Sequence, residues 1–291
     1  MPVEQQLRPR VKDIGGGFMV RRLLPTLHTP SVGPFVFFDH FGPTTTKPDD
    51  NHDVRPHPHI GLSTVTYLFE GAMLHRDSLG SVQRIEPRAL NWMTAGRGIV
   101  HSERAPPDLR GTTYGIHGLQ LWAALPKAFE ESEPAFHHMA ADALPEWSQP
   151  GMRVRVLVGS AFGRESPVST HSKTLYLDVT ASEGSTLLLS PEPAVATFER
   201  AAYSTDHGIV VDGVDVPAFT MAVLTPGVES TIAAPRGARY VVIGGEALDG
   251  PRFLWWNFVS SSKERIEQAK GDWTEQRMGR IPGEHEWIPL P

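Results

Sequence analysis

Residues 55–61 have the sequence RPHPHIG, and residues 99–103 have the sequence IVHSE. In a β-strand, side chains two positions apart point to the same face. The two histidines of the first stretch would therefore project together, as would the histidine and the glutamate of the second. Two such strands facing one barrel interior would bring three imidazoles and one carboxylate to a common point.

The side chains concerned are His57, His59, His101 and Glu103. Three nitrogen donors and one oxygen donor suit a divalent first-row transition metal. In an octahedron, such a set leaves up to two neighbouring positions open for a substrate and dioxygen. The spacing thus makes these four residues candidate metal ligands.

Neither pair is informative by itself, because a chain of this composition contains about 0.6 His-x-His pairs and about 0.8 His-x-Glu pairs by chance. The residues around them add weight. Glu70-Gly71 follows the first pair after one strand length, and Gly96-Arg97-Gly98 is a turn signal just before the second pair. The succession His-x-His, Glu-Gly and Gly-x-Gly-x-x-His is the two-motif layout of cupin metal barrels.

Short β-rich runs between glycine and proline turns fill most of the chain, which has 27 Gly and 26 Pro. Many closely spaced strands predict an antiparallel sandwich or barrel, so the expected fold class is all-β. One helix is expected at residues 261–270, with a capping box of Ser261 and Glu264 and a stop at Gly271, and a weaker helical stretch covers residues 127–132. The expected strands cover residues 34–38, 64–69, 115–125, 152–158, 174–180, 185–190, 219–224 and 239–244.

A segment rich in Pro, Glu, Ala and His separates two strand-rich blocks of similar length. We expect a first domain at residues 1–130, a linker at residues 131–150 and a second domain at residues 151–291. The similar block lengths hint at an internal duplication. Only two of the 13 histidines lie beyond residue 171, which predicts that the first domain binds the metal and the second binds none.

The composition excludes several classes of protein. The chain has 27 Lys and Arg against 33 Asp and Glu, a net charge of −6, and no cysteine, which excludes disulfides, thiolate nucleophiles and Cys-ligated metal sites. Mild acidity argues against a nucleic-acid surface. No apolar run approaches the ~20 residues of a membrane span, and the polar N-terminus lacks the apolar segment of a signal peptide. We therefore expect a cytoplasmic protein.

The chain resembles the pirins, two-cupin proteins of the cupin superfamily. The resemblance covers nearly the whole chain and is densest in residues 34–126. It implies a fold of two cupin barrels of the double-stranded β-helix or jelly-roll type, followed by a short C-terminal helix. The matching stretches are PFVFFDHFGP (34–43), RPHPHIGLSTVTYLFEG (55–71), HRDSLG (75–80), NWMTAGRGIVHSE (91–103), GLQLWAALP (118–126) and WWNFVSSSKERIEQAKGDW (255–273).

Pirins hold one iron in the N-terminal cupin through a His-x-His pair and a His-x-Glu pair. Carried over to this sequence, the resemblance implies His57, His59, His101 and Glu103 as the ligands. It implies iron(II) as the cofactor, although three histidines and one glutamate also accept Mn, Co, Ni, Cu or Zn.

The sequence departs from many pirins just after the first histidine pair. Ile60, Leu62 and Ser63 stand where an Arg-Gly-Phe-Glu pattern is common. Many cupins use a glutamate four positions after the second histidine as a ligand, and here Glu103 supplies the carboxylate instead. We expect a less charged mouth of the metal cavity, with consequences for substrate preference.

The remaining histidines are expected to have structural roles. His40 is predicted to be packed in the core, with support of a metal ligand as the alternative, and His117 is predicted to be packed or at the surface. His75 with Asp77 is predicted to stabilise a turn. Gln120 either lines the metal cavity or is a hydrogen-bonded structural amide. Three further histidines, predicted to be solvated in polar loops, are His52, His137 and His138.

The resemblance implies two functions of different kinds. The first is a quercetin 2,3-dioxygenase-type oxidoreductase, which takes a flavonol-like aromatic substrate and dioxygen. Our own hypothesis is that Glu103 is the catalytic proton acceptor while it ligates the metal. The second is an iron-dependent redox-sensing regulator that acts through protein partners without catalysis. We expect a monomer that binds neither nucleic acid nor a membrane directly.

Overall fold

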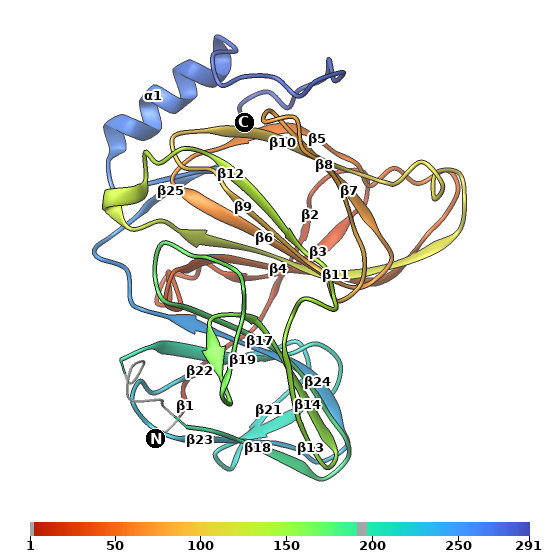
Figure 1. The fold of residues 1–291 in the computed structure, drawn as a ribbon, viewed down its shortest axis with the longest axis vertical. Helices are drawn as coiled ribbons and strands as arrows, with labels where there is room; N and C mark the ends of the chain where they lie inside the picture. Colours follow the sequence, from red (N-terminus) through yellow and green to blue (C-terminus); the bar gives the residue numbers. More distant parts are fainter. Residues whose placement is uncertain (1–2, 191–196) are drawn as a thin grey trace. The chain divides into compact units, whose positions relative to one another are not determined.

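Strand-forming runs between glycine and proline turns build most of the molecule (Figure 1). The computed structural model describes residues 3–190 and 197–291. All eight expected strand runs are present, and further strands lie between them. The helix is α1 (Lys263–Thr274), and a 3₁₀ turn, η1, covers Lys127–Phe129.

The strands of the described residues are β1 (Val3–Leu7), β2 (Arg10–Asp13), β3 (Met19–Leu24), β4 (Phe35–Thr46), β5 (Val54–His59), β6 (Leu62–Glu70), β7 (Met73–Asp77), β8 (Val82–Ile85), β9 (Leu90–Thr94), β10 (Ile99–Arg104), β11 (Tyr114–Ala124), β12 (Ala135–Met139), β13 (Glu146–Gln149), β14 (Met152–Val158), β15 (Ser160–Ala161), β16 (Arg164–Glu165), β17 (Thr174–Ala181), β18 (Ser185–Leu189), β19 (Glu199–Ser204), β20 (Ile209–Val211), β21 (Val214–Val216), β22 (Met221–Leu224), β23 (Ser230–Ala234), β24 (Ala238–Gly245), β25 (Phe253–Trp255) and β26 (Phe258–Ser260).

The barrel that carries the candidate ligands consists of two antiparallel sheets. The seven-stranded sheet has the order β12-β9-β6-β11-β4-β3-β2, and the four-stranded sheet has the order β5-β10-β7-β8. Side chains of the two sheets meet inside. Trp122 of β11 lies edge-on to His59 of β5 at 5.1 Å, and Phe136 of β12 stacks on His75 of β7 at 4.2 Å between ring centroids.

The second barrel repeats this arrangement strand for strand. Its sheets have the orders β1-β22-β19-β24-β17-β14-β13 and β18-β23-β20-β21, so each strand from β17 to β24 takes the place of the corresponding strand from β4 to β11. Its core is a cluster of apolar side chains that includes Val156, Leu177, Leu187 and Ile232. The predicted all-β fold of two cupin barrels with a C-terminal helix is confirmed, and the shared strand order supports an internal duplication.

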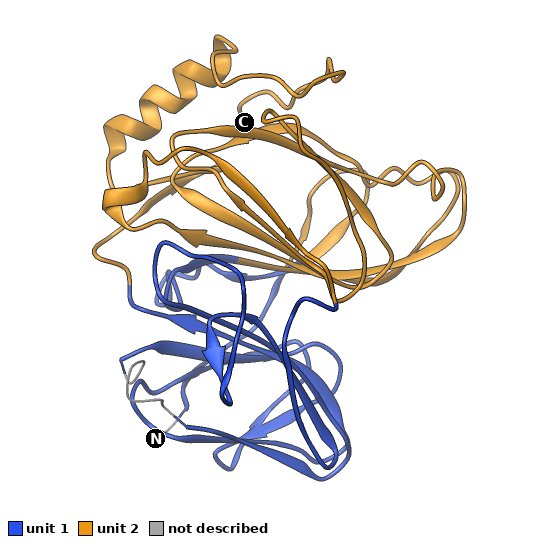
Figure 2. Cartoon of the chain, viewed as in Figure 1, with its two compact units in different colours: residues 1–10, 21–37, 142–247 blue, residues 11–20, 38–141, 248–291 orange. Residues whose placement is uncertain are grey.

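The two compact units are assembled from separate segments of the chain, as Figure 2 shows. The expected domains were contiguous, whereas in the structure the C-terminal residues join the first barrel and the N-terminal strand joins the second. The first barrel's unit comprises residues 11–20, 38–141 and 248–291, and the second barrel's unit comprises residues 1–10, 21–37 and 142–247.

Strand pairing and apolar packing explain this exchange of segments. β1 pairs with β22 at the edge of the second barrel, the place that β12 holds in the first. The C-terminal residues Phe258 and Trp273 are buried in one apolar cluster with Ile60 and Val100. The tail therefore folds onto the barrel whose strands supply those two partners, because burial of large apolar side chains drives the association.

The cap of α1 lies one residue beyond the predicted position. Ser262 is the N-cap, and its Oγ accepts a hydrogen bond from the Arg265 backbone amide at 3.2 Å. Ser261 instead donates its backbone amide and its hydroxyl to the carboxylate of Glu130. The predicted capping box is therefore wrong by one residue, because the amide and hydroxyl of Ser261 donate hydrogen bonds to Glu130, which is distant in sequence.

The helix continues through Gly271, where the sequence predicted its end. Trp273 is buried, and its Nε1 donates to the carbonyl oxygen of Ile288 at 2.9 Å, so tertiary packing outweighs the low helix propensity of glycine. The stretch predicted to be helical at residues 127–132 forms only a 3₁₀ turn. In the described part of the chain, no helix is long and apolar enough to cross a membrane.

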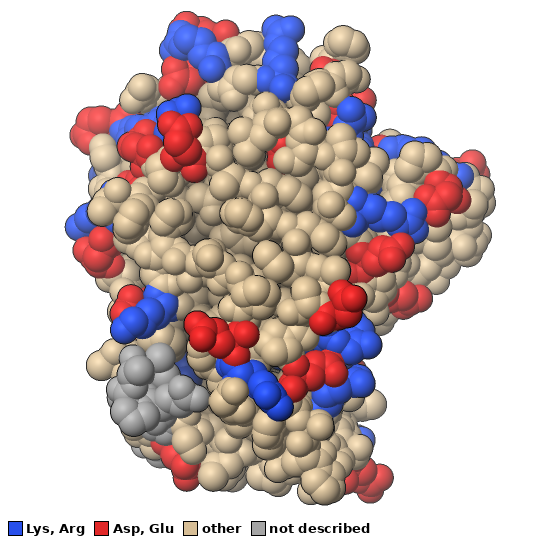
Figure 3. Space-filling model, in the orientation of Figure 1, with Lys and Arg blue, Asp and Glu red and all other residues tan. Residues whose placement is uncertain are grey.

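Basic and acidic side chains lie close together on the face drawn in Figure 3. Exposed pairs on the molecule include Arg84 with Asp108 at 2.6 Å and Lys173 with Glu246 at 3.6 Å. Solvent-exposed pairs of this kind each contribute about 0–1 kcal/mol. The surface charge therefore explains little of the stability, which rests on the two apolar cores.

Candidate metal centre

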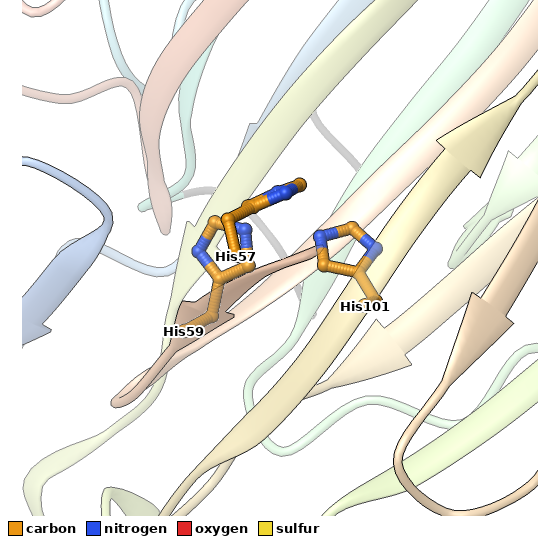
Figure 4. A group of neighbouring side chains, drawn as sticks. All are labelled: His57, His59 and His101. Carbon is orange, nitrogen blue, oxygen red and sulfur yellow. The ribbon is translucent and has the colours of Figure 1, made fainter. Parts of the chain in front are cut away.

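Strands β5 and β10 run antiparallel, and their register places the candidate ligands side by side. His57 lies opposite His101, and His59 lies opposite Ile99. One ligand nitrogen each from His57, His59 and His101 lies within 4.8 Å of those of the other two. Figure 4 shows the three rings gathered at this point. The structure thus brings together the three histidines that the sequence pattern placed on inward strand faces.

Glu103 lies beside the triad at an irregularity in the strand pairing, but it is not part of the group of ligand atoms that lie within 4.8 Å of one another. The register shifts between His101 and Glu103, so that Glu103 lies opposite Val54. Its Oε1 is 3.3 Å from His101 Nδ1, and its Oε2 is 4.0 Å from His57 Nε2. Donors bound to one ion at about 2.0–2.2 Å lie about 3 Å apart when adjacent and about 4 Å apart when opposite. The separations are compatible with one shared ion.

Backbone carbonyl groups orient two of the three rings. His57 Nδ1 donates to the carbonyl oxygen of Arg55, and His59 Nδ1 donates to that of Asn257, each at 2.9 Å. This leaves Nε2 of both rings free to face the common point. A metal-binding histidine usually makes such a hydrogen bond through its other nitrogen, which fixes the tautomer and the ring plane.

Burial sets the protonation of the four side chains. It lowers the pKa of His57 to about 4 and lowers the pKa values of His59 and His101 well below the usual range, because desolvation disfavours the charged ring. The three rings are neutral at neutral pH, and neutral imidazole is the form that binds metals. The same desolvation raises the pKa of Glu103 to about 8.

Several buried atoms at this point have no hydrogen-bond partner among the described residues. They are Oε2 of Glu103 and both ring nitrogens of His101. A buried polar group without a partner costs about 1–3 kcal/mol, and a divalent cation would satisfy Glu103 Oε2 and one of the two ring nitrogens of His101. Three neutral imidazoles and one carboxylate also suit such a cation chemically. The residues present therefore fit a metal ion.

A fourth buried histidine, His75, lies beside the triad. Its ring centroid is 5.4 Å from that of His101, and its Nε2 donates to Asp77 Oδ2 at 2.9 Å. Asp77 Oδ1 accepts hydrogen bonds from the backbone amides of Leu79 and Ser81, which confirms the predicted turn. The closeness of His75 to the triad is not visible in the spacing, because the spacing does not show that β7 pairs with β10.

The seven-stranded sheet supplies an aromatic contact to the triad. Gln120 Oε1 accepts a hydrogen bond from Thr66 Oγ1 at 2.8 Å across the β11–β6 pair, which matches the structural-amide interpretation. Two residues further along β11, Trp122 contacts His59 edge-on. Trp122 is thus the β11 side chain that packs against a candidate ligand.

The other histidines divide into packed and exposed groups. His40 is fully buried, and its Nε2 lies 2.7 Å from Nε2 of His117, so the predicted packing of both is confirmed. His137 is exposed as predicted. His138 is half-buried, and its Nδ1 lies 2.7 Å from Asn91 Oδ1. Its predicted solvation is therefore only partial.

A small cavity of about 20 Å³ lies against Glu103. Phe18 and His52 form part of its wall and stack on each other, with ring centroids 4.6 Å apart and an interplanar angle of 15°. His52 is half-buried in its loop, so its predicted solvation is only partial. Its polar neighbours in sequence do not reveal an aromatic partner that comes from a different loop.

The residues that replace the common Arg-Gly-Phe-Glu pattern lie away from this cavity. Ile60 is buried in the apolar cluster of the C-terminal tail, and Leu62 is fully buried. Ser63 is buried, and its Oγ shares a hydrogen bond of 3.1 Å with Thr94 Oγ1. The expectation that these positions lower the charge of the cavity mouth is wrong, because they face the core and the tail.

The C-terminal tail also contacts the outer face of the ligand strands. Ser102, which separates the two candidate ligands of β10, donates to Glu284 Oε1 at 2.7 Å. Arg104 Nη2 donates to Glu284 Oε2 at 2.5 Å. The backbone amide of Ile288 donates to the carbonyl oxygen of Pro56 at 2.9 Å. The tail thus holds β5 and β10 from behind, at residues adjacent to the candidate ligands.

Fold and site together define a two-cupin protein whose first barrel holds a buried histidine triad that could bind a metal. Residues 17–123 match the Pirin family model, and residues 176–279 match the model of the Pirin C-terminal cupin domain. A pirin-like protein of Caulobacter vibrioides is 46% identical over 97% of this chain and 97% of its own length. The chain belongs to the pirin family, as its sequence motifs predicted.

Other relatives include a protein of known crystal structure and a eukaryotic pirin. The crystal structure of a quercetin 2,3-dioxygenase from Acinetobacter baumannii superimposes with a TM-score of 0.91 at 37% identity, covering 99% of this chain and 94% of that one. Human pirin is 32% identical over 93% of this chain and 91% of its own length. The likeness therefore extends over both barrels.

Proposed function

We propose that the chain is a metal-dependent dioxygenase that opens flavonols such as quercetin, with iron(II) held by His57, His59, His101 and Glu103. The observation that carries this proposal is the buried meeting of three neutral imidazoles, with the carboxylate of Glu103 beside two of them and several polar atoms without a partner among the described residues. The likeness to the quercetin 2,3-dioxygenase structure supports the choice of substrate class. The same donors also accept Mn, Co, Ni, Cu or Zn.

The chemistry of a flavonol matches such a site. Its 3-hydroxyl and 4-keto oxygens lie on one edge and form a chelating pair. When bound, the metal would lower the pKa of the hydroxyl and draw the flavonol and dioxygen together. Dioxygen is the oxidant in the overall reaction. The two carbon–carbon bonds beside C3 break, C3 leaves with its oxygen as carbon monoxide, and both atoms of dioxygen stay in the ester product.

The chain's own residues provide proton transfer and preorganisation. Glu103 Oε2, which has no partner among the described residues, would accept the proton of the 3-hydroxyl. The carbonyl groups of Arg55 and Asn257 hold two rings in place before substrate binds. The buried surroundings of the triad limit access of water.

The test begins with metal analysis of the purified protein, followed by anaerobic addition of quercetin. Chelation should shift the flavonol absorption band, and admission of air should remove that band with release of carbon monoxide. Glu103→Gln should retain metal through the three histidines and lose turnover by about 100-fold or more. Glu86→Gln, an exposed surface change, is the matched control and should behave as the wild type.

Retained turnover in Glu103→Gln would contradict the role of Glu103 as the proton acceptor. A flavonol that binds to the metal and remains intact in air would contradict the dioxygenase, and would direct attention to the regulatory alternative. Metal analysis of the protein as isolated decides between iron and the other metals.

A further inference from the structure

The cavity beside Glu103 is too small for the proposed substrate. Its volume is about 20 Å³, whereas a single water needs about 10–15 Å³ and pockets for drug-sized ligands measure about 300–1,000 Å³. A flavonol that approaches Glu103 through this cavity must therefore displace part of its wall. The side chains of the wall include Phe18, His52, Met73, Tyr114 and Ile116.

Phe18 is a buried member of an apolar cluster, but it is a wall residue that belongs to no paired strand. Met73 belongs to β7, and Tyr114 and Ile116 belong to β11, so their displacement would disturb paired strands. Phe18 instead lies in the turn between β2 and β3. Its ring is buried against His52 at 4.6 Å and against Phe41 at 5.5 Å.

The turn that carries Phe18 is built from three exposed glycines, Gly15, Gly16 and Gly17, with φ values of 126°, 64° and 78°. A side chain at Gly16 would lie 2.6 Å from the carbonyl oxygen of Asn51, so the turn fits closely there, whereas Gly15 and Gly17 face open space. Glycine crosses between backbone conformations at low steric cost. The glycines give this turn more conformational freedom than other residues would, and two backbone hydrogen bonds, from Ile14 to Phe18 and from Phe18 to Gly15, close it.

A much larger hollow lies directly outside this turn. It measures about 760 Å³, and Gly15, Gly16 and Asn51 line it. It shares Arg104 and Ala105 with the small cavity. The backbone of the glycine turn thus borders the large hollow, while the Phe18 ring borders the small cavity at Glu103. Arg104 and Ala105 lie between the two spaces, and displacement of the Phe18 ring would enlarge the small cavity at Glu103 next to the large hollow.

We propose that Phe18 is the specificity-determining residue that limits the size of the aromatic chelator reaching Glu103 and the histidine triad. This deepens the proposed function and rests on it. The Phe18 ring excludes bulky ligands while it stacks on His52, and it admits a flavonol when the glycine turn opens. A compact chelator with the same hydroxy-keto edge needs less displacement and should reach the centre more freely.

The test compares two ligands and three variants in protein loaded with cobalt(II), under anaerobic conditions. The ligands are quercetin and a single-ring 3-hydroxy-4-pyranone, and stopped-flow absorption follows their association. Phe18→Ala should raise the association rate constant of quercetin by about tenfold or more and change that of the pyranone by less than about twofold. Phe18→Leu, which retains an apolar side chain in the packed turn, should give an intermediate increase.

Met19→Ala is the matched control, because Met19 is the next residue and is exposed; it should leave both rates unchanged. Equal quercetin rates in the wild type and in Phe18→Ala would overturn the proposal, as would failure of quercetin to associate with either Phe18 variant. Subsequent admission of air to iron-loaded protein separates the two claims. Faster association of quercetin without turnover supports the role of Phe18 and contradicts the dioxygenase. Turnover with an unchanged association rate supports the dioxygenase and contradicts the role of Phe18.

Discussion

In the first barrel, β5 and β10 pair so that His59 lies opposite Ile99, and in the second barrel, β18 and β23 pair so that Leu189 lies opposite Ser230. Counting from these matching ends gives equivalent inward positions in the two four-stranded sheets. Those positions carry His57, His59, His101 and Glu103 in the first barrel and Leu187, Leu189, Ile232 and Ala234 in the second.

The difference shows that strand order fixes where inward side chains meet but leaves their chemistry open. The apolar set of the second barrel satisfies itself by packing, because its side chains belong to one continuous core. The polar set of the first barrel leaves buried atoms without partners among the described residues. The first barrel could therefore hold an ion where the second has only close packing, and substitutions at equivalent positions should separate the two cases.

The largest effect is expected from His101→Ala compared with Ile232→Ala. Loss of His101 removes one of three imidazole donors, so metal affinity should fall by more than the about 10–100-fold that changes outside the ligand set cost. Ile232→Ala opens a cavity in the second core and should destabilise the protein by about 2–5 kcal/mol. Metal content after desalting and denaturant unfolding measure the two effects.

Metal affinity of Ile232→Ala should equal that of the wild type. If Ile232→Ala released the metal, or if His101→Ala bound it normally, the hypothesis that only the first barrel binds metal would be wrong.

The next effect concerns the pH dependence of the metal-free protein. The folded pKa of Glu103 is about 8, against a usual value of 4.5. Between these values the folded protein retains a proton that the unfolded chain has released, so the contribution of Glu103 to stability falls as pH rises through this window. Glu103→Gln lacks this loss. Its melting temperature should exceed that of the wild type by about 2–4 °C or more at pH 8, and the difference should shrink toward pH 5.

The buried histidines act in the opposite direction and cancel in this comparison. The folded pKa of His57 is about 4, below its usual 6.5, so the unfolded chain binds a proton that the folded protein rejects, and stability falls as pH decreases from 6.5 to 4. Wild type and Glu103→Gln share this acid-side loss. A difference in melting temperature that did not vary between pH 5 and pH 8 would show that Glu103 is not strongly desolvated.

The features of this architecture that depend on local sequence could be predicted. Strand runs between glycine and proline turns, and donors two residues apart, depend only on the period of a strand, so the all-β fold and the inward faces of His57 and His59 could be predicted. The same argument failed for the helix cap, where the carboxylate of Glu130 binds Ser261. A distant partner leaves no local pattern.

The surroundings of the candidate site could not be predicted for the same reason. Phe18 reaches the cavity at Glu103 from the β2–β3 turn. Asn257 contacts His59 from the C-terminal segment, which follows the second barrel in the sequence. Both contacts depend on how remote segments pack. A period-two pattern says which face a side chain takes, and it does not say which other segment covers that face.

The smallest effect is expected from a substitution in the C-terminal tail. It tests whether metal affinity in the first barrel depends on contacts between this tail and the ligand strand β10. Glu284 accepts hydrogen bonds from Ser102 and Arg104 on the ligand strand β10. Glu284→Gln keeps the size of the side chain but weakens the contact with the Arg104 guanidinium, because a charge-assisted bond is stronger than a neutral one. Metal affinity should fall by about tenfold, in the range found for groups that support metal ligands.

Glu286→Gln is the control for this experiment, because Glu286 is exposed and lies farther from Arg104, at 3.5 Å. Competition with a chelator of known affinity measures the metal affinity, and the melting temperature of the metal-free protein reports any general destabilisation. A fall in affinity for Glu284→Gln alone, with little change in melting temperature, would show that the tail positions the ligands. Equal affinities in both variants would mean that β10 holds His101 and Glu103 in place without the tail, and that the barrel sheets alone determine the site.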